Sequence, residues 1–199
     1  VEYVRDEQLY SSNSPRIIST IPIPVLLGLL EPPPPEDIAQ CVKNIKYLSV
    51  IVVYLVIGDR DIFDCSYLYI LGRPYNRISN TRQFCSSLCP SGQNMIAHEI
   101  TCEFGDSVWN QSDDELVSTV VNGMTEDGFL TKGEVQKTFV VRKQHAYPFY
   151  TVDYKRNLDK AKSFIESIEG LTTIGRTGGF KYMDIDQCIE DASGHALRR

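Results

Sequence analysis

The sequence has no apolar run long enough to cross a lipid bilayer. Its longest largely apolar segment, Tyr47–Ile57, has 11 residues, whereas a membrane-spanning helix needs about 20. We therefore predict no transmembrane segment and interpret Tyr47–Ile57 as a buried β-strand.

The sequence also has no excess of positive charge. Lysine and arginine total 20 against 26 aspartate and glutamate residues, which gives a net charge of -6. Proteins that bind nucleic acids generally carry a basic patch or stripe, so we predict no nucleic-acid partner. Arg73, Arg77 and Arg82 form only a local cluster, which suits a small anionic ligand and favours a small-molecule substrate.

Cysteines are few and irregularly spaced. The six cysteines favour reduced thiols and a cytoplasmic protein. Cys85, Cys89, His98 and Cys102 resemble a zinc set only loosely, because the first pair is C-x3-C and the last two residues lie in an expected strand. We predict no metal site.

Motifs for nucleophilic catalysis are absent as well. There is no G-x-S-x-G sequence and no cysteine with a placed histidine, so the catalytic residues are unknown at this stage. His98 and His145 alternate with apolar neighbours and are interpreted as structural. The sequence shows no signal peptide and begins at Val1, so we expect the natural N-terminus to lie upstream.

The segments that are present alternate between short strands and amphipathic helices. Ser112–Glu115 has the S-x-x-E form of a capping box and predicts a helix that continues to Met124. Apolar spacing predicts further helices around Ile38–Ile45 and after Asp153, which is expected to cap the second one. We expect strands over Ile17–Ile21, Tyr47–Ile57, Cys65–Leu71, Tyr75–Ser79, Met95–Glu103, Val135–Ala146 and Leu171–Ile174. This pattern predicts an α+β fold with a mainly antiparallel sheet and flanking helices.

Residues 170–192 form the stretch with the most chemical content. A short strand leads into a turn with glycines at 175, 178 and 179 and an arginine at 176, and a helix is expected from about Asp184. Glycines let a backbone approach a ligand closely, arginine binds phosphate, and a helix N-terminus favours negative charge. The stretch is typical of a phosphate or cofactor cradle, and an ordinary solvated turn is the alternative.

Four segments together resemble the flavin-dependent amine oxidase superfamily, in particular its protoporphyrinogen-oxidase-like members and UDP-galactopyranose mutase. They are Ile17–Pro22, Pro74–Ile78, His145–Pro148 and Ile174–Asp186. The last matches a G-R-x-G-x-x-x-Y-x-x-x-D pattern that closes over the flavin in these families. The resemblance extends from about residue 15 to residue 192.

One departure from the family is decisive. These enzymes bind FAD through an N-terminal G-x-G-x-x-G unit, which this sequence lacks. The resemblance therefore implies a C-terminal portion whose partner is a missing N-terminal FAD-binding half, with FAD in the full-length protein and absent from this chain. It implies a strand segment returning past the FAD domain (1–24), a substrate-binding-domain-like α+β region (25–146), and a C-terminal strand-turn-helix of the FAD domain (147–199).

The resemblance also implies roles for individual residues. The expected substrate-binding residues are Arg77, Tyr147 and Tyr182. The expected cofactor-binding residues are Gly175, Arg176, Gly178, Gly179, Tyr182, Asp184, Asp186 and Gln187. Alternative roles remain open: ion pairs for the arginines, core packing for the tyrosines and helix capping for the aspartates.

Three functions follow as hypotheses. The favoured one is a portion of an FAD-dependent oxidoreductase that is inactive alone. The second is a mutase-like flavoenzyme, which would need two arginines and paired tyrosines for a diphosphate. The third is an α+β binding module without cofactor. The oligomeric state is left open.

Overall fold

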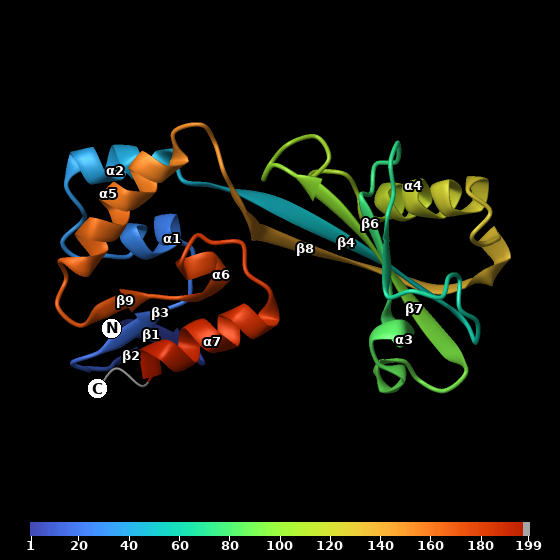
Figure 1. The fold of residues 1–199 in the computed structure, drawn as a ribbon, viewed down its shortest axis with the longest axis horizontal. Helices are drawn as coiled ribbons and strands as arrows, with labels where there is room; N and C mark the ends of the chain where they lie inside the picture. The colour runs from blue at the N-terminus through green and yellow to red at the C-terminus, as the bar shows by residue number, and fades with distance from the viewer. Residues whose placement is uncertain (197–199) are drawn as a thin grey trace. The chain divides into compact units, whose positions relative to one another are not determined.

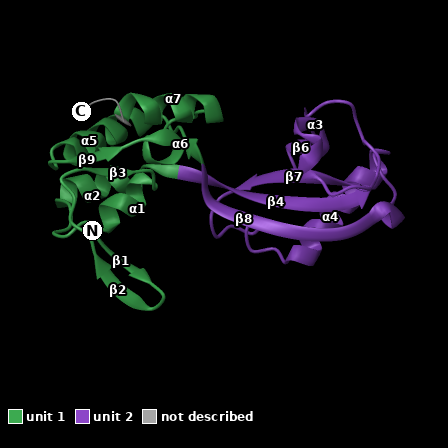
Figure 2. Ribbon diagram, turned by 90° about the horizontal axis from the view of Figure 1, so that it is seen from below, with its two compact units in different colours: residues 1–46, 147–199 green, residues 47–146 purple. Residues whose placement is uncertain are grey.

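The computed structural model describes residues 1–196 and divides the chain into two compact units (Figure 2). Unit 2 is continuous and comprises residues 47–146. Unit 1 is discontinuous and joins residues 1–46 with the residues from 147 onward. Residues 25–46, which the sequence assigned to the middle region, belong to unit 1 by their contacts.

Unit 2 is built on a five-stranded sheet with the order β5-β6-β7-β4-β8. The pairs β4–β7, β5–β6 and β6–β7 are antiparallel. The strands are β4 (Lys46–Gly58), β5 (Tyr67–Tyr69), β6 (Arg77–Asn80), β7 (Gln93–Cys102) and β8 (Val135–Phe149). The helical segments are α3 (Thr81–Phe84), α4 (Asp113–Glu126) and the 3₁₀ turns Ser86–Leu88 and Lys132–Glu134.

One face of this sheet and helix α4 enclose the core of unit 2. Side chains alternate along a strand, so Ile51, Val53, Leu55 and Ile57 of β4 point to one side and are buried. The apolar stripe of α4 packs in the same core through Leu116, Val120 and Met124. The helix begins at the capping box that the sequence predicts, in which the Ser112 and Glu115 side chains bond each other's backbone N–H groups.

Unit 1 contains most of the helices and two small sheets (Figure 1). Strand β1 (Glu2–Arg5) pairs with β2 (Gln8–Ser11) in an exposed antiparallel hairpin. Strand β3 (Ile17–Ser19) pairs in parallel with β9 (Leu171–Thr173), so segments from the N-terminal and C-terminal parts of the chain meet here. The helices are α1 (Ile23–Gly28), α2 (Glu36–Lys43), α5 (Tyr154–Glu166), α6 (Gly175–Gly178) and α7 (Ile185–Ala196).

The predicted fold class is confirmed, since the protein combines a five-stranded antiparallel sheet with flanking helices. Two local predictions were wrong. The glycine turn at 175–178 is the short helix α6, and the side chain of Asp153 makes no capping bond to α5. Within residues 1–196, no helix combines the length and the apolar character needed to cross a membrane.

Candidate functional site

The residues predicted to contact a cofactor lie along α6, the following loop and the first turn of α7. Gly175 opens α6 with a φ angle of 76°, a conformation that glycine adopts without strain. Its backbone N–H donates to the Asp191 carboxylate of α7 at 2.8 Å. Asp191 therefore ties α7 to the start of α6. The signal for this role in the sequence is weak, an acidic residue on a polar C-terminal helix.

Two of the predicted cradle glycines serve the packing of the chain itself. A Cβ atom at Gly178 would lie 2.9 Å from the Ser19 carbonyl oxygen of β3. A Cβ at Gly179 would lie 2.6 Å from the Gly175 carbonyl oxygen. A side chain at Gly178 would collide with β3, so α6 lies this close to β3 only with glycine there, and a side chain at Gly179 would collide with the first residue of α6 itself. At Gly175, by contrast, a Cβ would meet nothing within 4 Å.

An aromatic cluster supports the loop between α6 and α7. Phe180 is buried and has a positive φ of 49°. Its ring meets the Tyr150 ring edge-on with the ring centroids 5.8 Å apart, and its centroid lies 6.1 Å from that of Tyr154. The Tyr182 backbone N–H donates to the Tyr150 hydroxyl at 2.8 Å. These contacts fix the loop that presents Tyr182, and no pattern in the sequence pointed to this role for Phe180 or Tyr154.

Arg176 lies at the centre of the candidate site. Its guanidinium carbon is 4.6 Å from the ring centroid of Tyr147 and 4.2 Å from that of Tyr182. The two rings are nearly parallel, with centroids 6.1 Å apart. One guanidinium N–H group donates to the Met183 carbonyl at 3.0 Å, and Nε is buried without a hydrogen-bond partner. The structure thus brings together three of the predicted residues.

Helix α7 begins beside this cluster. The Gln187 side chain accepts a hydrogen bond from the Asp184 N–H at 2.9 Å, and the Asp184 carbonyl accepts the first helical bond from Cys188 at 3.0 Å. Gln187 thereby holds the helix start, which confirms the predicted helix. The first N–H groups of a helix have no intrahelical acceptor, so Ile185 and Asp186 present theirs at this end. Asp184 and Asp186 are exposed.

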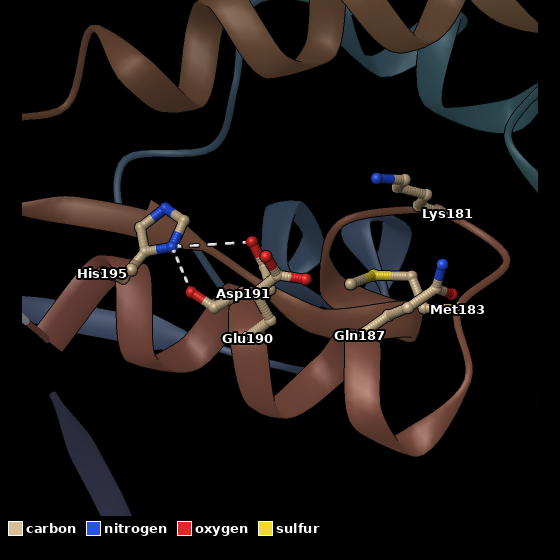
Figure 3. Close-up of a pocket in the computed structure, with 7 residues that line it drawn as sticks. Lys181, Met183, Gln187, Glu190, Asp191 and His195 are labelled. Atoms are coloured by element: carbon tan, nitrogen blue, oxygen red, sulfur yellow. Dashed lines mark hydrogen bonds and ion pairs between the residues drawn. The ribbon is translucent and has the colours of Figure 1, made fainter.

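Two surface hollows of about 390 Å³ each flank α7. The first combines the Arg176 guanidinium with apolar side chains of the helix; its lining residues are Arg176, Met183, Asp184, Ile185, Cys188, Ile189 and Ala192. The second is more polar (Figure 3) and is lined by Lys181, Met183, Gln187, Glu190, Asp191, Gly194 and His195. Its His195 Nδ1 lies 2.8 Å from the Asp191 carbonyl and 3.6 Å from the Asp191 carboxylate (Figure 3).

Arg77, the predicted substrate arginine, belongs to β6 of unit 2. Its Nε donates to the Glu99 carboxylate at 3.0 Å, and its guanidinium lies 5.7 Å from the ring centroid of Tyr67. The register aligns Arg77 with Glu99 on the neighbouring strand. The ion pair that the sequence left open as an alternative is therefore present.

The two strand histidines have the structural surroundings that the sequence suggested. His98 is fully buried, and its Nδ1 lies 3.2 Å from the Val53 carbonyl. Burial lowers the pKa of His98 to about 4. His145 packs edge-on against Tyr47, with the ring centroids 5.3 Å apart. Burial lowers the pKa of His145 as well. Among residues 1–196, no three His, Cys, Asp or Glu side chains gather as a metal site would require.

Comparison with known proteins gives a match in structure only. No protein-family model and no curated protein matches the sequence. A reduced UDP-galactopyranose mutase is similar over 88% of this chain and 38% of its own, with a TM-score of 0.73 and 17% identity. A putative protoporphyrinogen oxidase from Exiguobacterium sp. 255-15 is similar over 90% and 40%, with a TM-score of 0.67 and 14% identity.

Putrescine oxidase bound to putrescine is similar over 92% of this chain and 43% of its own, with a TM-score of 0.61 and 12% identity. The chain therefore spans about two fifths of each of these solved proteins. The resemblance predicted from the sequence is confirmed as a shared fold: this chain has the fold of a part of the UDP-galactopyranose mutase, protoporphyrinogen oxidase and putrescine oxidase structures.

Proposed function

We propose that this chain is the substrate-domain and C-terminal portion of an FAD-dependent oxidoreductase of the amine oxidase or protoporphyrinogen oxidase kind. The observation that carries the proposal is the arrangement of Arg176 and the start of α7 in a chain with this fold. The fold is shared with two oxidases over nine tenths of the chain and about two fifths of theirs. The remaining part of the protein would supply the main FAD-binding unit.

The residues around Arg176 fit the flavin end of such a cofactor. Arg176 has a buried Nε without a partner, which is a donor that a bound group could use. Tyr147 and Tyr182 offer ring surfaces, and Met183 and Ile185 make the adjoining hollow partly apolar. The glycines fit less well, because the space beside Gly178 and Gly179 is already occupied by the chain's own backbone. We therefore assign the contact to Arg176, Tyr182 and the α7 N-terminus.

A flavin supplies two-electron redox chemistry through its ring system. The chain's own contribution is electrostatic. The first N–H groups of α7 favour negative charge nearby by about 0.3–1 kcal/mol, and by about 2 kcal/mol where partly buried. Gln187 keeps these groups in place by bonding the Asp184 N–H. Arg176 adds a permanent positive charge, and two tyrosine rings hold its guanidinium group in position.

A second candidate is a sugar-nucleotide mutase, and one observation favours it. The UDP-galactopyranose mutase has a TM-score of 0.73 to this chain, against 0.61 for putrescine oxidase. The stacked Tyr147–Tyr182 pair beside Arg176 also provides the paired tyrosines that diphosphate recognition was expected to need. Arg77 belongs to unit 2, and its ion pair with Glu99 already uses part of its guanidinium.

The test compares the 199-residue chain with the polypeptide encoded by the complete coding sequence. We expect the complete polypeptide to show flavin absorbance and the 199-residue chain to show none. Arg176→Ala in the complete polypeptide should reduce flavin content, whereas Arg156→Ala, which removes an exposed arginine of α5, should not. A complete polypeptide without flavin, and without an upstream strand followed by G-x-G-x-x-G, would refute the proposal.

Substrate assays separate the two candidates. The flavin-containing polypeptide is incubated with putrescine and, separately, with UDP-galactopyranose. Consumption of an amine with reduction of the flavin supports the oxidoreductase. Isomerisation of the sugar nucleotide without net redox change supports the mutase.

A further inference from the structure

The loop between α6 and α7 (residues 179–184) is tied down on both sides of Tyr182. The Lys181 N–H donates to the Arg176 carbonyl at 3.1 Å, and the Arg176 guanidinium donates to the Met183 carbonyl at 3.0 Å. Both bonds join the loop to α6, its immediate neighbour. The Tyr182 N–H donates instead to the Tyr150 hydroxyl at 2.8 Å, across 32 residues of sequence. Tyr150 therefore ties the loop to a segment outside α6 and α7.

Packing on two sides holds the Tyr150 ring in place. Its centroid lies 4.6 Å from that of Tyr154, the first residue of α5, and 5.8 Å from that of Phe180. The backbone after Tyr150 is fixed as well, because the Tyr154 N–H donates to the Thr151 carbonyl at 3.1 Å. A ring packed in this way retains few rotamers. The hydroxyl is thus already directed at the Tyr182 N–H, and the bond costs little further ordering.

The backbone of Phe180 shows that the loop is held in a shape it would not adopt alone. Its φ of 49° lies in the left-handed region, which is unfavourable for a bulky residue. Such strain persists only where the surrounding structure enforces it, and it is often found at functional sites. Here the Phe180 ring is buried against Tyr150 and Tyr154. The same aromatic cluster therefore enforces the turn and supplies the hydroxyl that receives the Tyr182 N–H.

The position of Tyr182 matters because its ring carries Arg176. The guanidinium carbon lies 4.2 Å from the Tyr182 centroid, closer than the 4.6 Å to the Tyr147 centroid. Tyr182 is 50% exposed, so burial alone does not fix its ring. The bond from its backbone to Tyr150 supplies the missing restraint.

We propose that Tyr150 is a positioning residue, whose hydroxyl fixes Tyr182 and thereby sets the Arg176 guanidinium for contact with the cofactor. The proposal rests on the proposed function, because that function identifies the cofactor. Tyr150 acts only through Tyr182 and Arg176 and need not touch the cofactor itself. The 199-residue chain already contains every residue of this arrangement, so the arrangement can be tested without a cofactor.

Nuclear magnetic resonance of the 199-residue chain provides the first test. The currents of the two nearby tyrosine rings should shift the Arg176 Nε–H proton away from the position of an exposed arginine such as Arg156. Tyr150→Phe keeps the ring and removes the hydroxyl. We expect the Arg176 signal to move towards the exposed position and the Tyr182 amide to exchange at least about tenfold faster.

Tyr154→Phe is the matched control, because it removes a hydroxyl from the same aromatic cluster and leaves the bond between Tyr150 and Tyr182 in place. Its Arg176 signal and its Tyr182 exchange rate should stay as in the unchanged chain. Unchanged signals in Tyr150→Phe would overturn the proposal. So would equal changes in the two variants, because they would indicate a general loosening of the cluster.

FAD titration of the polypeptide encoded by the complete coding sequence, after removal of its flavin, provides the second test. Tyr150→Phe should weaken FAD binding by about tenfold, the effect of one lost hydrogen bond. Tyr154→Phe should change the affinity by less than about twofold. The midpoint potential of the bound flavin should shift in Tyr150→Phe alone, because only that variant moves the Arg176 charge. Equal affinities and potentials in the two variants would contradict the role of Tyr150.

The two proposals fail separately. A complete polypeptide that binds flavin equally well with Tyr150→Phe would retain the proposed function and reject the positioning role. A complete polypeptide without flavin would reject the proposed function. Loss of the Arg176 signal shift in the Tyr150→Phe chain would then still establish that Tyr150 positions Arg176, with flavin rejected as the group it serves.

Discussion

Units 1 and 2 are nearly equal in length but differ in how they place their apolar side chains. Among the described residues, fifteen large apolar side chains of unit 1 are exposed, against seven of unit 2. Unit 2 collects its buried residues in one cluster between a five-stranded sheet and α4. Within residues 1–196, the sheets of unit 1 are two-stranded, and its hairpin β1–β2 is exposed along its whole length.

This difference teaches that unit 2 encloses its apolar side chains more completely than unit 1 does. A domain becomes stable by enclosing one apolar core, and unit 2 does so with its own residues. Unit 1 exposes apolar side chains, such as Ile185 and Ile189 of α7. Unit 2 is therefore expected to be the more stable unit in the isolated chain.

The largest expected effect is a separation of the two units in urea. Unit 1 should unfold first, and a stability gap of about 2–3 kcal/mol would separate the midpoints by about 1–2 M. Trp109, the single tryptophan, packs against the core of unit 2 and reports on that unit through its fluorescence. Near-ultraviolet circular dichroism of the tyrosines reports on both units. Coincident transitions for the two signals would contradict the comparison.

Acid should act strongly on unit 2. Burial lowers the pKa of His98 from 6.5 to about 4, so the unfolded chain binds a proton between these values and the folded chain does not. The stability contributed by neutral His98 is fully present above pH 6.5 and is lost as the pH falls towards 4, by about 3 kcal/mol. Trp109 fluorescence in urea at several pH values measures this loss.

His98→Phe removes the titrating group and should flatten most of that dependence. A smaller slope should remain in this variant, because burial also lowers the pKa of His145 in the same unit. An unchanged slope would show that His98 is not the group responsible.

The next effect is steric and should change the free energy of unfolding of unit 2 by about 1–3 kcal/mol. A Cβ at Gly123 of α4 would lie 2.6 Å from the Tyr75 hydroxyl oxygen, which is buried without a partner. Gly123→Ala should therefore destabilise unit 2 despite the higher helix propensity of alanine. Tyr75→Phe removes the colliding atom, so the double variant should recover most of the loss. Additive effects in this double-mutant cycle would rule out the clash.

The smallest expected effect concerns unit 1. Asp191→Ala removes the acceptor of the Gly175 N–H and should lower the stability of unit 1 by about 1 kcal/mol. The Trp109 transition of unit 2 should not move. Glu190→Ala, at an exposed neighbour on the same helix, is the matched control. Equal effects of the two variants would indicate that helix composition, and not the bond to α6, determines the result.

Local signals predicted unit 2 better than unit 1. The S-x-x-E capping box and apolar spacing identified α4, and the apolar run at Tyr47–Ile57 identified β4, because both depend on neighbouring residues. The β3–β9 pair joins opposite ends of the chain, and no local pattern encodes such a contact. The β1–β2 turn uses Asp6 and Glu7 with positive φ, without the glycine or asparagine that usually indicates such a turn.

The candidate site was predicted only in part, because some of its contacts join residues that are distant in the sequence. Arg176, Tyr147 and Tyr182 were selected, and the structure groups them around one guanidinium. The roles of Gly178 and Gly179 depend on how closely α6 lies to β3 and to its own first turn, which sequence spacing does not reveal. Asp191 and Phe180 act through contacts made only after folding.

The chain passes from unit 1 into unit 2 along β4 and returns to unit 1 along β8. These two strands are neighbours in the same sheet. The Ser49 hydroxyl donates to the Gln144 carbonyl at 2.8 Å, so the two connecting strands run together. An insertion whose ends already meet imposes little loop-closure cost on its host. Recombination can therefore exchange the whole sheet for another with the same two-strand attachment without altering a residue of unit 1.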